Sequence, residues 1–468
     1  MSSKKLQAKI RLNFPFKPTS KQNQVITDIS DFITTIGNKS IFILKGYAGT
    51  GKTTLVSTLV KSLPILGKQS VLMAPTGRAA KVLSKYSKKS ASTIHRKIYW
   101  IKNNKYGNTF ITLKENTYNN TVFIVDEASM IPEKSDKGFG NRSLLDDLIK
   151  YVYDGYDCKL ILTGDTAQLP PVHLEISPAL DKTKIASYYK KHVICKELTE
   201  VVRQKEKSLI LKNATYLRKK ITNNDYSYPK LATNSEVIRI NSGEYLQDIL
   251  ESTYNNDEVS NTTIICRSNR RANLYNQQIR TQIRFQENEI SAGDILMVVR
   301  NNYHWTNDDS KIGFIANGDI VEVLRIKEKI DRYGFHFARS TIKMIDYSQE
   351  KELDVILLLD TLTSESPAIT YEQYQKLYKE VGLDYNGEKE KNKKIKENEY
   401  FNALQIKFAY SITCHKSQGG QWENVFIDLG YFKEEMLDKS YLRWLYTAIT
   451  RSTKKLYLIN FNNKFFKL

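Results

Sequence analysis

The residues with the most specific chemistry in this sequence form a glycine-rich segment, GYAGTGKTT, at positions 46–54. The apolar run 41–45 before it predicts a strand, and the spaced leucines after it predict a helix. Gly46, Gly51, Lys52 and Thr53 have the spacing of a phosphate-binding loop, whose glycines let backbone N–H groups face a phosphate. In such a loop the lysine reaches the outer phosphates and the threonine hydroxyl ligates Mg²⁺. The alternative, a glycine-rich turn with an exposed lysine, is disfavoured because strand and helix both flank the loop.

A glutamine upstream of this loop adds a second feature of a nucleotide site. Gln22 follows Thr19 and Ser20, either of which can cap a helix that begins there. An amide offers a donor and an acceptor side by side, which suits the edge of adenine. Alone, a glutamine in a first helical turn is ordinarily just solvated. The residues predicted to bind ATP are Gln22, Gly46, Ala48, Gly49, Thr50, Gly51, Lys52, Thr53 and Thr54.

Two adjacent carboxylates follow another buried strand. The run 121–125 (TVFIV) leads directly into Asp126 and Glu127. We expect Asp126, together with Thr53, to hold Mg²⁺, and Glu127 to orient and deprotonate the attacking water. A solvated acidic turn is the alternative, and the phosphate loop upstream makes it the weaker one.

Three further polar residues complete a hydrolytic set. Gln168 lies in the loop GDTAQLPPV after the buried strand 159–162, where its amide can donate to a γ-phosphate. Arg203, in LTEVVRQ, and Arg451, after an amphipathic helix, are candidates to balance charge in the transition state. An arginine at a helix end is more often a satisfied surface charge. The predicted catalytic residues are Lys52, Glu127, Gln168, Arg203 and Arg451.

Composition favours a polyanionic partner. The 468 residues carry a formal net charge of +20, with 29 tyrosines and 18 phenylalanines that can stack on bases or fill cores. A basic composition kept for solubility is the alternative. We expect no membrane span and no signal peptide, and the four scattered cysteines form no CxxC pair, which fits a reducing cytosol.

The chain reads as two α/β series with insertions. Residues 98–120 predict a β-hairpin within the first series, and short strands between 293 and 347 predict a small β-barrel within the second. We expect residues 1–17 to be loosely ordered and the charged stretch 386–399 to be a linker or flexible flap. The turns at 75–78 (PTGR) and 411–420 (SITCHKSQGG) offer hydroxyls and cations suited to a phosphodiester backbone.

The ordered set of motifs resembles superfamily 1B DNA helicases of the RecD/Dda group. It runs through APTGRAAK, STIH, VDEAS, GDTAQLPPV, LTEVVRQ, CRSN, TCHKSQG and TAITR, and it spans nearly the whole chain. The resemblance implies an α/β fold with two RecA-like P-loop domains, a pin hairpin in the first and an SH3-like barrel in the second. The implied boundaries are 1–97 with 121–204, the pin 98–120, 205–290 with 405–468, and the barrel insertion 291–404.

The resemblance also implies an activity and a set of contacts. It implies ATP- and Mg²⁺-dependent 5′ to 3′ movement on single-stranded DNA and unwinding of forked duplex, by a monomer that is compatible with replication, recombination or repair partners. The implied nucleic-acid-binding residues are Pro75, Thr76, Arg78, His95, Asn269, Thr413, His415, Lys416 and Gln418, and the candidates for the pin are Trp100, Tyr106 and Phe110. A DNA-stimulated ATPase that remodels protein–DNA complexes without unwinding is one alternative, a P-loop recruitment module with degenerate catalysis is another, and an RNA substrate is a third.

Overall fold

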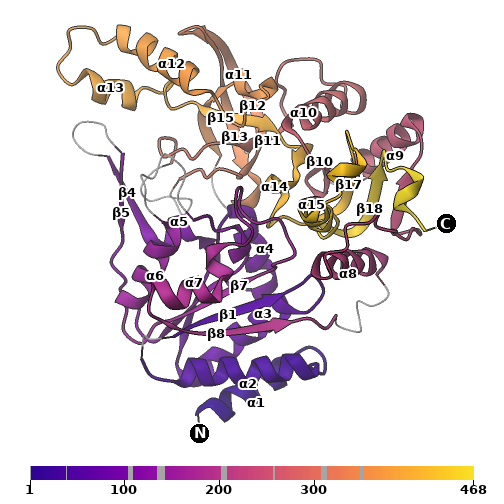
Figure 1. Cartoon of the computed structure of the whole chain (residues 1–468). Coiled ribbons are helices and arrows are strands. Elements are labelled where there is room, and N and C mark those ends of the chain that lie inside the picture. Colours follow the sequence, from indigo (N-terminus) through magenta and orange to yellow (C-terminus); the bar gives the residue numbers. More distant parts are fainter. Residues whose placement is uncertain are drawn as a thin grey trace.

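The chain folds into two α/β units joined side by side, with a barrel above them (Figure 1). The computed structural model describes residues 2–37, 40–103, 109–133, 143–201, 208–256, 259–306, 314–347 and 352–467. We call the six-stranded sheet with its helices the first unit, and the five-stranded sheet with its helices the second unit.

The first unit is built on a parallel sheet whose inner strands are almost entirely buried. Its strand order is β3-β2-β6-β7-β1-β8. The strands are β1 (Ser40–Gly46), β2 (Gln69–Ala74), β3 (Ala91–Thr93), β6 (Thr121–Val125), β7 (Lys159–Gly164) and β8 (His192–Leu198). Continuous apolar runs suit such strands because helices cover both faces of a parallel sheet. The predicted strands before the phosphate loop and before Asp126 are thereby confirmed.

Helices cover both faces of this sheet and supply its two cores. One core contains residues from α1 (Ser2–Asn13), α2 (Ser20–Thr34) and α3 (Lys52–Ser62). The other contains residues from α5 (Ile94–Ile98), α6 (Leu144–Asp154) and α7 (Lys182–Tyr188), while α4 (Gly77–Ser87) follows β2. The N-terminal segment is therefore a packed helix and not a loose lead-in, because Leu6 and Ile10 are fully buried in the core that α1 shares with α2 and α3.

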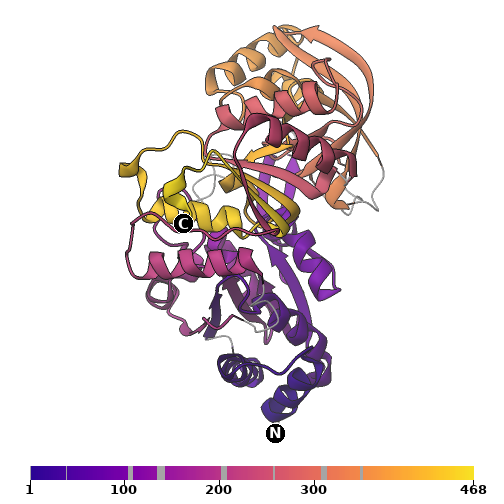
Figure 2. The same cartoon turned by 90° about the vertical axis from the view of Figure 1, so that its right-hand side faces the viewer.

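The predicted hairpin is present and leaves the first unit directly after α5. Its strands are β4 (Tyr99–Asn103) and β5 (Thr109–Leu113), paired antiparallel with Tyr99 opposite Leu113. Figures 1 and 2 show it rising from the first unit toward the barrel. The turn that joins the two strands lies outside the described residues.

The second unit repeats the parallel arrangement with a smaller sheet. Its order is β16-β10-β17-β18-β9. The strands are β9 (Val237–Ile240), β10 (Thr262–Cys266), β16 (Ser411–Thr413), β17 (Trp422–Asp428) and β18 (Ser452–Ile459). Its helices are α8 (Leu209–Thr222), α9 (Gly243–Asn256), α10 (Asn269–Gln278), α14 (Cys414–Ser417) and α15 (Lys439–Ile449). Helices α8 and α15 pack against each other.

A closed five-stranded barrel is inserted between β10 and β16 of the second unit. It consists of β11 (Ile295–Val298), β12 (Ile320–Arg332), β13 (Phe335–Met344), β14 (Leu353–Leu358) and β15 (Leu404–Phe408). The predicted barrel is confirmed, but its last strand crosses the boundary placed at 404/405. The second α/β series resumes after β15, because residues 404–408 pair with β11 and β14.

An arm of short helices projects from the barrel between β14 and β15. It contains α11 (Asp360–Thr363), α12 (Tyr371–Leu383) and α13 (Lys391–Glu397). The expected flexible flap at 386–399 is instead partly helical, because Ile395 is fully buried in a small core with Leu377 and Val381. None of the helices in the described parts of the chain combines the length and the apolarity of a membrane span.

Candidate ATP site and nucleic-acid groove

The phosphate-binding loop lies between β1 and α3, as its spacing predicts. Gly49 and Gly51 have φ angles of 78° and 85°, in the left-handed region that favours glycine. At Gly46 a Cβ atom would lie 2.8 Å from Cγ of Lys52, so any side chain there would displace the lysine. The ammonium of Lys52 donates to the carbonyl of Gly46 across the loop. The loop thus presents backbone N–H groups and one cation at the start of a helix, which suits a phosphate.

The side chain of Gln22, in the first turn of α2, is hydrogen-bonded to this loop. Its amide nitrogen donates to the carbonyl of Thr50 (3.0 Å), and its amide oxygen accepts from the backbone N–H of Thr19 (3.0 Å). Thr19 is the N-cap of α2 and forms a reciprocal capping box with Gln22. Both the nitrogen and the oxygen of the amide are therefore hydrogen-bonded to the protein. Gln22 must break these hydrogen bonds before it can bind adenine.

The two predicted carboxylates stand at the carboxyl edge of the same sheet. Asp126 accepts from the hydroxyl of Thr163 and from the backbone N–H of Glu127 (2.9 Å). Glu127 has a φ of 53°, an uncommon conformation for a side chain of this kind and one that clusters at functional sites. Burial raises the pKa of Glu127, while the nearby charges of Arg451 and Lys52 lower it and that of Asp126 raises it. A carboxylate in such surroundings suits a general base.

The GDTAQLPPV loop reaches from the first sheet into the second unit. Asp165 is buried and accepts from the backbone N–H of Ala167 (2.9 Å). Gln168 is also buried, and its side-chain oxygen has no hydrogen-bond partner among the described residues. Ala167 and Leu169 pack within the hydrophobic core of the second unit. This loop therefore connects the edge of the ATP site to the other half of the molecule.

One of the two predicted arginines is placed beside the carboxylates. Arg451 follows α15 and is 4% exposed, and its guanidinium donates to the carbonyls of Thr447 (3.1 Å) and Gly420 (3.2 Å). Among the surrounding charges, its positive charge has the largest effect on the pKa of Glu127. The charge of an arginine of the second unit thus acts on a carboxylate of the first. Arg203 lies outside the described residues.

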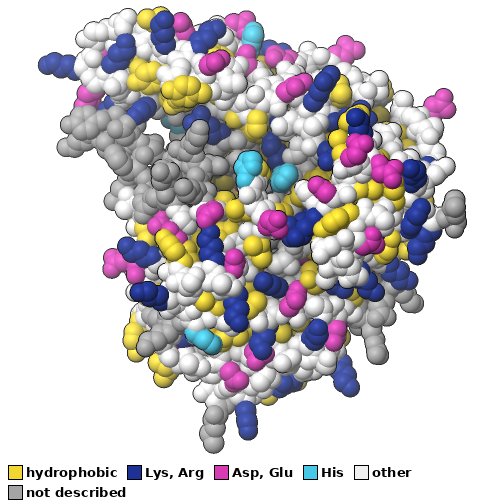
Figure 3. Space-filling view, in the orientation of Figure 1, with side chains coloured by type: hydrophobic (Ala, Val, Ile, Leu, Met, Phe, Trp, Pro, Cys, Tyr) yellow, Lys and Arg dark blue, Asp and Glu magenta, His cyan; other side chains and the backbone are white. Residues whose placement is uncertain are grey.

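A groove of about 680 Å³ lies between the first unit, the second unit and the barrel. Histidine, lysine and arginine side chains are visible on this face of the molecule (Figure 3). Seven predicted nucleic-acid-binding residues line the groove: Pro75, Thr76, Arg78, His95, His415, Lys416 and Gln418. Two segments separated by more than 300 positions therefore meet at one cavity. Asn269 and Thr413 lie at the carboxyl ends of the neighbouring strands β10 and β16, outside the lining of this cavity.

Burial favours the uncharged form of two histidines that line the groove. It lowers the pKa of His95 to about 4, and it lowers the pKa of His415 and of Lys416 below their ordinary values. At neutral pH the two imidazoles are therefore uncharged and can donate or accept a hydrogen bond. Thr76 caps α4 by accepting from the backbone N–H of Ala79 (3.3 Å), which orients the start of this helix at the groove.

The barrel contributes residues to the groove that the sequence motifs did not indicate. They come from its strand-connecting segments and from the helical arm: Arg300, Asn301, Tyr303, His304, Tyr374, Lys396 and Phe401. Aromatic and cationic side chains interleaved in this way suit bases and phosphates. The clusters of aromatic and basic residues in 300–305 and 371–401 are the only sequence signal for them, and such clusters are common in cores.

The hairpin presents one of its predicted aromatic residues to solvent. Trp100 is 56% exposed, and the ammonium of Lys114 lies 4.4 Å from the centre of its ring. Tyr106 lies outside the described residues, and only the backbone of Phe110, in β5, is described. Trp100 is thus the one pin candidate whose side chain can be placed.

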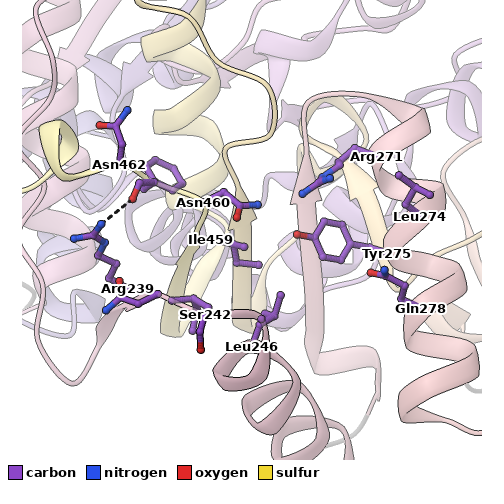
Figure 4. Close-up of a pocket in the computed structure, with 14 residues that line it drawn as sticks. Arg239, Ser242, Leu246, Arg271, Leu274, Tyr275, Gln278, Ile459, Asn460 and Asn462 are labelled. Atoms are coloured by element: carbon purple, nitrogen blue, oxygen red, sulfur yellow. Dashed lines mark hydrogen bonds between the residues drawn. The ribbon is translucent and has the colours of Figure 1, made fainter.

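The second sheet has a cavity at the position that the ATP site occupies in the first. When the strand orders of the two sheets are aligned, β9 corresponds to β1 and β17 corresponds to β6. A pocket of about 500 Å³ opens after β9, lined by Arg239, Ser242, Arg271, Tyr275 and Asn460 among others (Figure 4). Here the carboxylate that ends β17, Asp428, is bound by Arg271 (2.6 Å) and Asn460 (2.6 Å).

The connection after β9 also differs from a phosphate loop. Only residues 241 and 242 separate β9 from α9, and neither is a glycine or a lysine. With its carboxylate paired and its loop short, this edge of the second sheet lacks the features that make the first a triphosphate site. The cluster of charges formed by Lys52, Glu127 and Arg451 is the candidate ATP site.

Comparisons with known proteins find similarity to helicases. Residues 28–228 match the AAA domain, and residues 408–459 match the UvrD-like helicase C-terminal domain. The chain is 26% identical over 418 residues to the ATP-dependent DNA helicase dda of Enterobacteria phage T4, covering 82% of this chain and 86% of that protein. It is 32% identical over 174 residues to the ATP-dependent RecD2 DNA helicase of Deinococcus radiodurans, covering 37% of this chain and 21% of that protein.

A solved structure is similar at a lower sequence identity. The Pif1 helicase from Bacteroides, in complex with ADP-AlF3 and single-stranded DNA, is 15% identical, with a TM-score of 0.48 over 97% of this chain and 95% of that chain.

The fold and the site are those of a P-loop ATPase with two α/β units, and charges from both units act on Glu127. The motifs and the sequence matches support an ATP-dependent DNA helicase of superfamily 1B, similar to the RecD/Dda group.

Proposed function

We propose that this helicase moves 5′ to 3′ along single-stranded DNA and separates duplex DNA ahead of it. The observation that carries the proposal is the convergence of two sites on the same elements. The charge of Arg451 acts on Glu127 at the candidate ATP site. Arg451 also donates to the carbonyl of Gly420, close to Gln418, which lines the groove. A movement of residues at the candidate ATP site therefore takes place next to the groove.

The proposed chemistry uses residues from both units. The loop N–H groups and Lys52 hold the phosphates, and Glu127 accepts the proton of the attacking water while Gln168 orients the γ-phosphate. Arg451 balances the charge that develops on the transferred phosphoryl group, and we assign the same task to Arg203. The hydroxyl of Thr53 and the carboxylate of Asp126 fit Mg²⁺, because this ion is held by one or two protein oxygens together with phosphates. When bound, Mg²⁺ neutralises phosphate charge.

The proposed movement follows from closure of the cleft. When ATP draws Arg451 toward the phosphate loop, the second unit and the barrel shift relative to the first unit. Groove residues of the first unit, such as Thr76 and His95, then change their distance from those of the second, such as His415 and Gln418. Alternating grip during each cycle moves the strand in one direction. One chain contains both sides of the cleft, so the proposal needs no second copy.

The proposed DNA partner is supported by the chemistry of the groove and by the named relatives. The groove combines hydroxyls, neutral imidazoles and cations, which hold a backbone with little sequence preference. The matched proteins of phage T4 and Deinococcus radiodurans are named DNA helicases. We assign the hairpin, with Trp100 at its base, to strand separation.

The decisive experiment uses two fluorescent forks that differ only in the polarity of their single-stranded tail. We expect ATP-dependent strand release from the fork with a 5′ tail and little from the fork with a 3′ tail. Release from the 3′-tailed fork alone would overturn the polarity. DNA-stimulated ATP hydrolysis without release from either fork would support the remodelling ATPase instead. The same forks with an RNA tail test whether the groove accepts a 2′-hydroxyl.

A further inference from the structure

A buried tyrosine of the second unit contacts the phosphate loop of the first. Tyr446, in α15, is 1% exposed, and its hydroxyl accepts from the backbone N–H of Ala48 (2.9 Å). The same hydroxyl donates to Oδ2 of Asp165 (2.7 Å). Three segments that are far apart in the sequence therefore share one hydroxyl group: the phosphate loop, the GDTAQLPPV loop and α15.

The chemistry of the three groups fixes the direction of both hydrogen bonds. A backbone N–H can only donate, so the single proton of the tyrosine hydroxyl must point to the carboxylate. Burial, followed by the charge of Asp165, raises the pKa of Tyr446 well above its ordinary value, so the hydroxyl keeps its proton. Oδ1 of Asp165 accepts from Ala167 (2.9 Å), which leaves Oδ2 for Tyr446. No other side chain of similar shape satisfies the N–H and the carboxylate together.

The next residue of α15 continues the connection toward the groove. The hydroxyl of Thr447 accepts from the backbone N–H of Leu169 (2.9 Å), at the far end of the same loop. The carbonyl of Leu169 accepts from the side-chain amide of Gln418 (2.6 Å), which lines the groove. Successive hydrogen bonds therefore link Ala48, in the phosphate loop, to a residue of the groove.

We propose that the hydroxyl of Tyr446 is a positioning group that ties the phosphate loop and Asp165 to the second unit, and that it sets how strongly single-stranded DNA in the groove stimulates ATP hydrolysis. The inference rests on the proposed function, because it presumes that DNA occupies the groove. Its role differs from that of Arg451, because the hydroxyl acts through the loop backbone. Removing it leaves a buried N–H and a buried carboxylate each short of one partner.

The test compares two substitutions in the same helix. Tyr446→Phe keeps the ring and removes only the hydroxyl. Tyr441→Phe is the matched control, because Tyr441 is equally buried in α15 and its hydroxyl has no hydrogen-bond partner among the described residues. For each full-length protein, kcat and KM for ATP are measured with and without a saturating thymidine oligonucleotide, together with the thermal midpoint of unfolding.

We expect Tyr446→Phe to lower the ratio of DNA-stimulated to basal kcat by about tenfold, which corresponds to roughly 1.4 kcal/mol in activation free energy. The KM for ATP should change less than about threefold. Tyr441→Phe should keep the wild-type ratio. The double variant of Tyr446→Phe and Asp165→Asn should lose about as much as the more affected single variant, because both remove the same bond. That non-additivity identifies Asp165 as the partner.

Three results would overturn the inference. The first is an unchanged stimulation ratio in Tyr446→Phe. The second is an equal loss of basal and stimulated turnover with a lower unfolding midpoint, which indicates a structural role only. The third is an equal loss in Tyr441→Phe. If the wild-type protein itself shows neither DNA stimulation nor strand release, the proposed function fails, and this outcome is separate from the other three.

Discussion

At the scale of single residues, the site depends on charges that are held in or near low-dielectric surroundings. Glu127 combines a left-handed backbone conformation with a raised pKa, and it is approached by Lys52 from one unit and by Arg451 from the other. The energetic effect of each charge is larger here than at an exposed surface. We therefore expect ATP turnover to be most sensitive to changes in the charge of these few side chains.

Glu127→Gln should abolish most ATP turnover without abolishing binding. The amide has the size of the carboxylate but cannot accept the proton of water, so we expect kcat to fall by about 100-fold or more, the range typical for loss of a general base. Affinities for an ATP analogue and for an oligonucleotide should change little. Turnover at the parental rate would contradict the assigned role. Glu115→Gln, an exposed substitution in the same unit, is the control.

The raised pKa of Glu127 also predicts the pH dependence of turnover. The carboxyl group must be ionised to act as a base, so the acid limb of the kcat profile should lie at higher pH than for an ordinary glutamate. Glu127→Gln should lack this limb in its residual activity.

His95 predicts a second, independent pH effect, on stability. Burial lowers its pKa from 6.5 to about 4, so the unfolded chain binds this proton more readily than the folded protein. Stability should fall as the pH drops from about 6.5 toward 4, by at most about 3 kcal/mol from this group. His95→Asn should flatten that dependence in denaturant titrations at pH 7 and pH 5, whereas substitution of the exposed His192 should not.

At the scale of elements, sequence patterns predict what is local and miss what depends on tertiary contacts. The strands before the phosphate loop and before Asp126 are apolar runs bounded by functional turns, and they form as predicted. The helix α13 was missed because one buried residue, Ile395, holds an otherwise charged segment against α12. A single apolar position in seven residues gives no readable period.

The same distinction applies to the candidate site. Lys52 and Thr53 can be placed from spacing alone, because the loop that holds them is continuous in sequence. The hydroxyl of Tyr446 cannot, because its partner Asp165 is 281 positions away. The contribution of Arg300 and Tyr374 to the groove depends likewise on how the barrel closes against the first unit.

The barrel contacts the first unit through an ion pair at the base of the hairpin. Arg96, in α5, donates to the carbonyl of Phe314 (2.7 Å) and lies 3.6 Å from Oδ2 of the fully buried Asp319. Its guanidinium also lies over the ring of Tyr347, 4.5 Å from its centre. Because α5 continues directly into β4, this contact fixes the base of the hairpin against the barrel.

Arg96→Met should therefore uncouple strand separation from ATP use. The substitution leaves a buried carboxylate without this cation, so we expect a loss of about 3 kcal/mol in the free energy of unfolding. Strand release from the 5′-tailed fork should fall more than DNA-stimulated ATP hydrolysis does. Arg96→Lys, which keeps the charge but not the planar group, should show a smaller effect in the same direction. An unchanged ratio of release to hydrolysis would contradict a role in holding the hairpin.

At the scale of the whole molecule, the two parallel sheets carry different functional features. The first sheet carries the phosphate loop, and at the matching edge of the second, Asp428 is paired with Arg271 and the loop after β9 is too short. The second unit instead contributes Arg451, which follows α15, to the charges that act on Glu127. Under the proposed function, hydrolysis depends on an approach between the two units, which is how a chemical step can be coupled to movement.

Arg451→Lys tests this dependence on closure directly. The lysine keeps a positive charge, but it has a single donor centre and cannot reproduce the fork of donors that an arginine presents to a phosphoryl group. We expect kcat in the presence of DNA to fall by roughly 10- to 100-fold, less than complete loss of an arginine finger, with KM for ATP changed less than about threefold. Arg443→Lys is the control, because this residue of the same helix contacts the carbonyl of Glu175 (2.8 Å) outside the carboxylate cluster. Wild-type turnover in Arg451→Lys, measured at saturating ATP and oligonucleotide, would mean that hydrolysis does not require the second unit to supply a bidentate cation, and cleft closure would then need another physical origin.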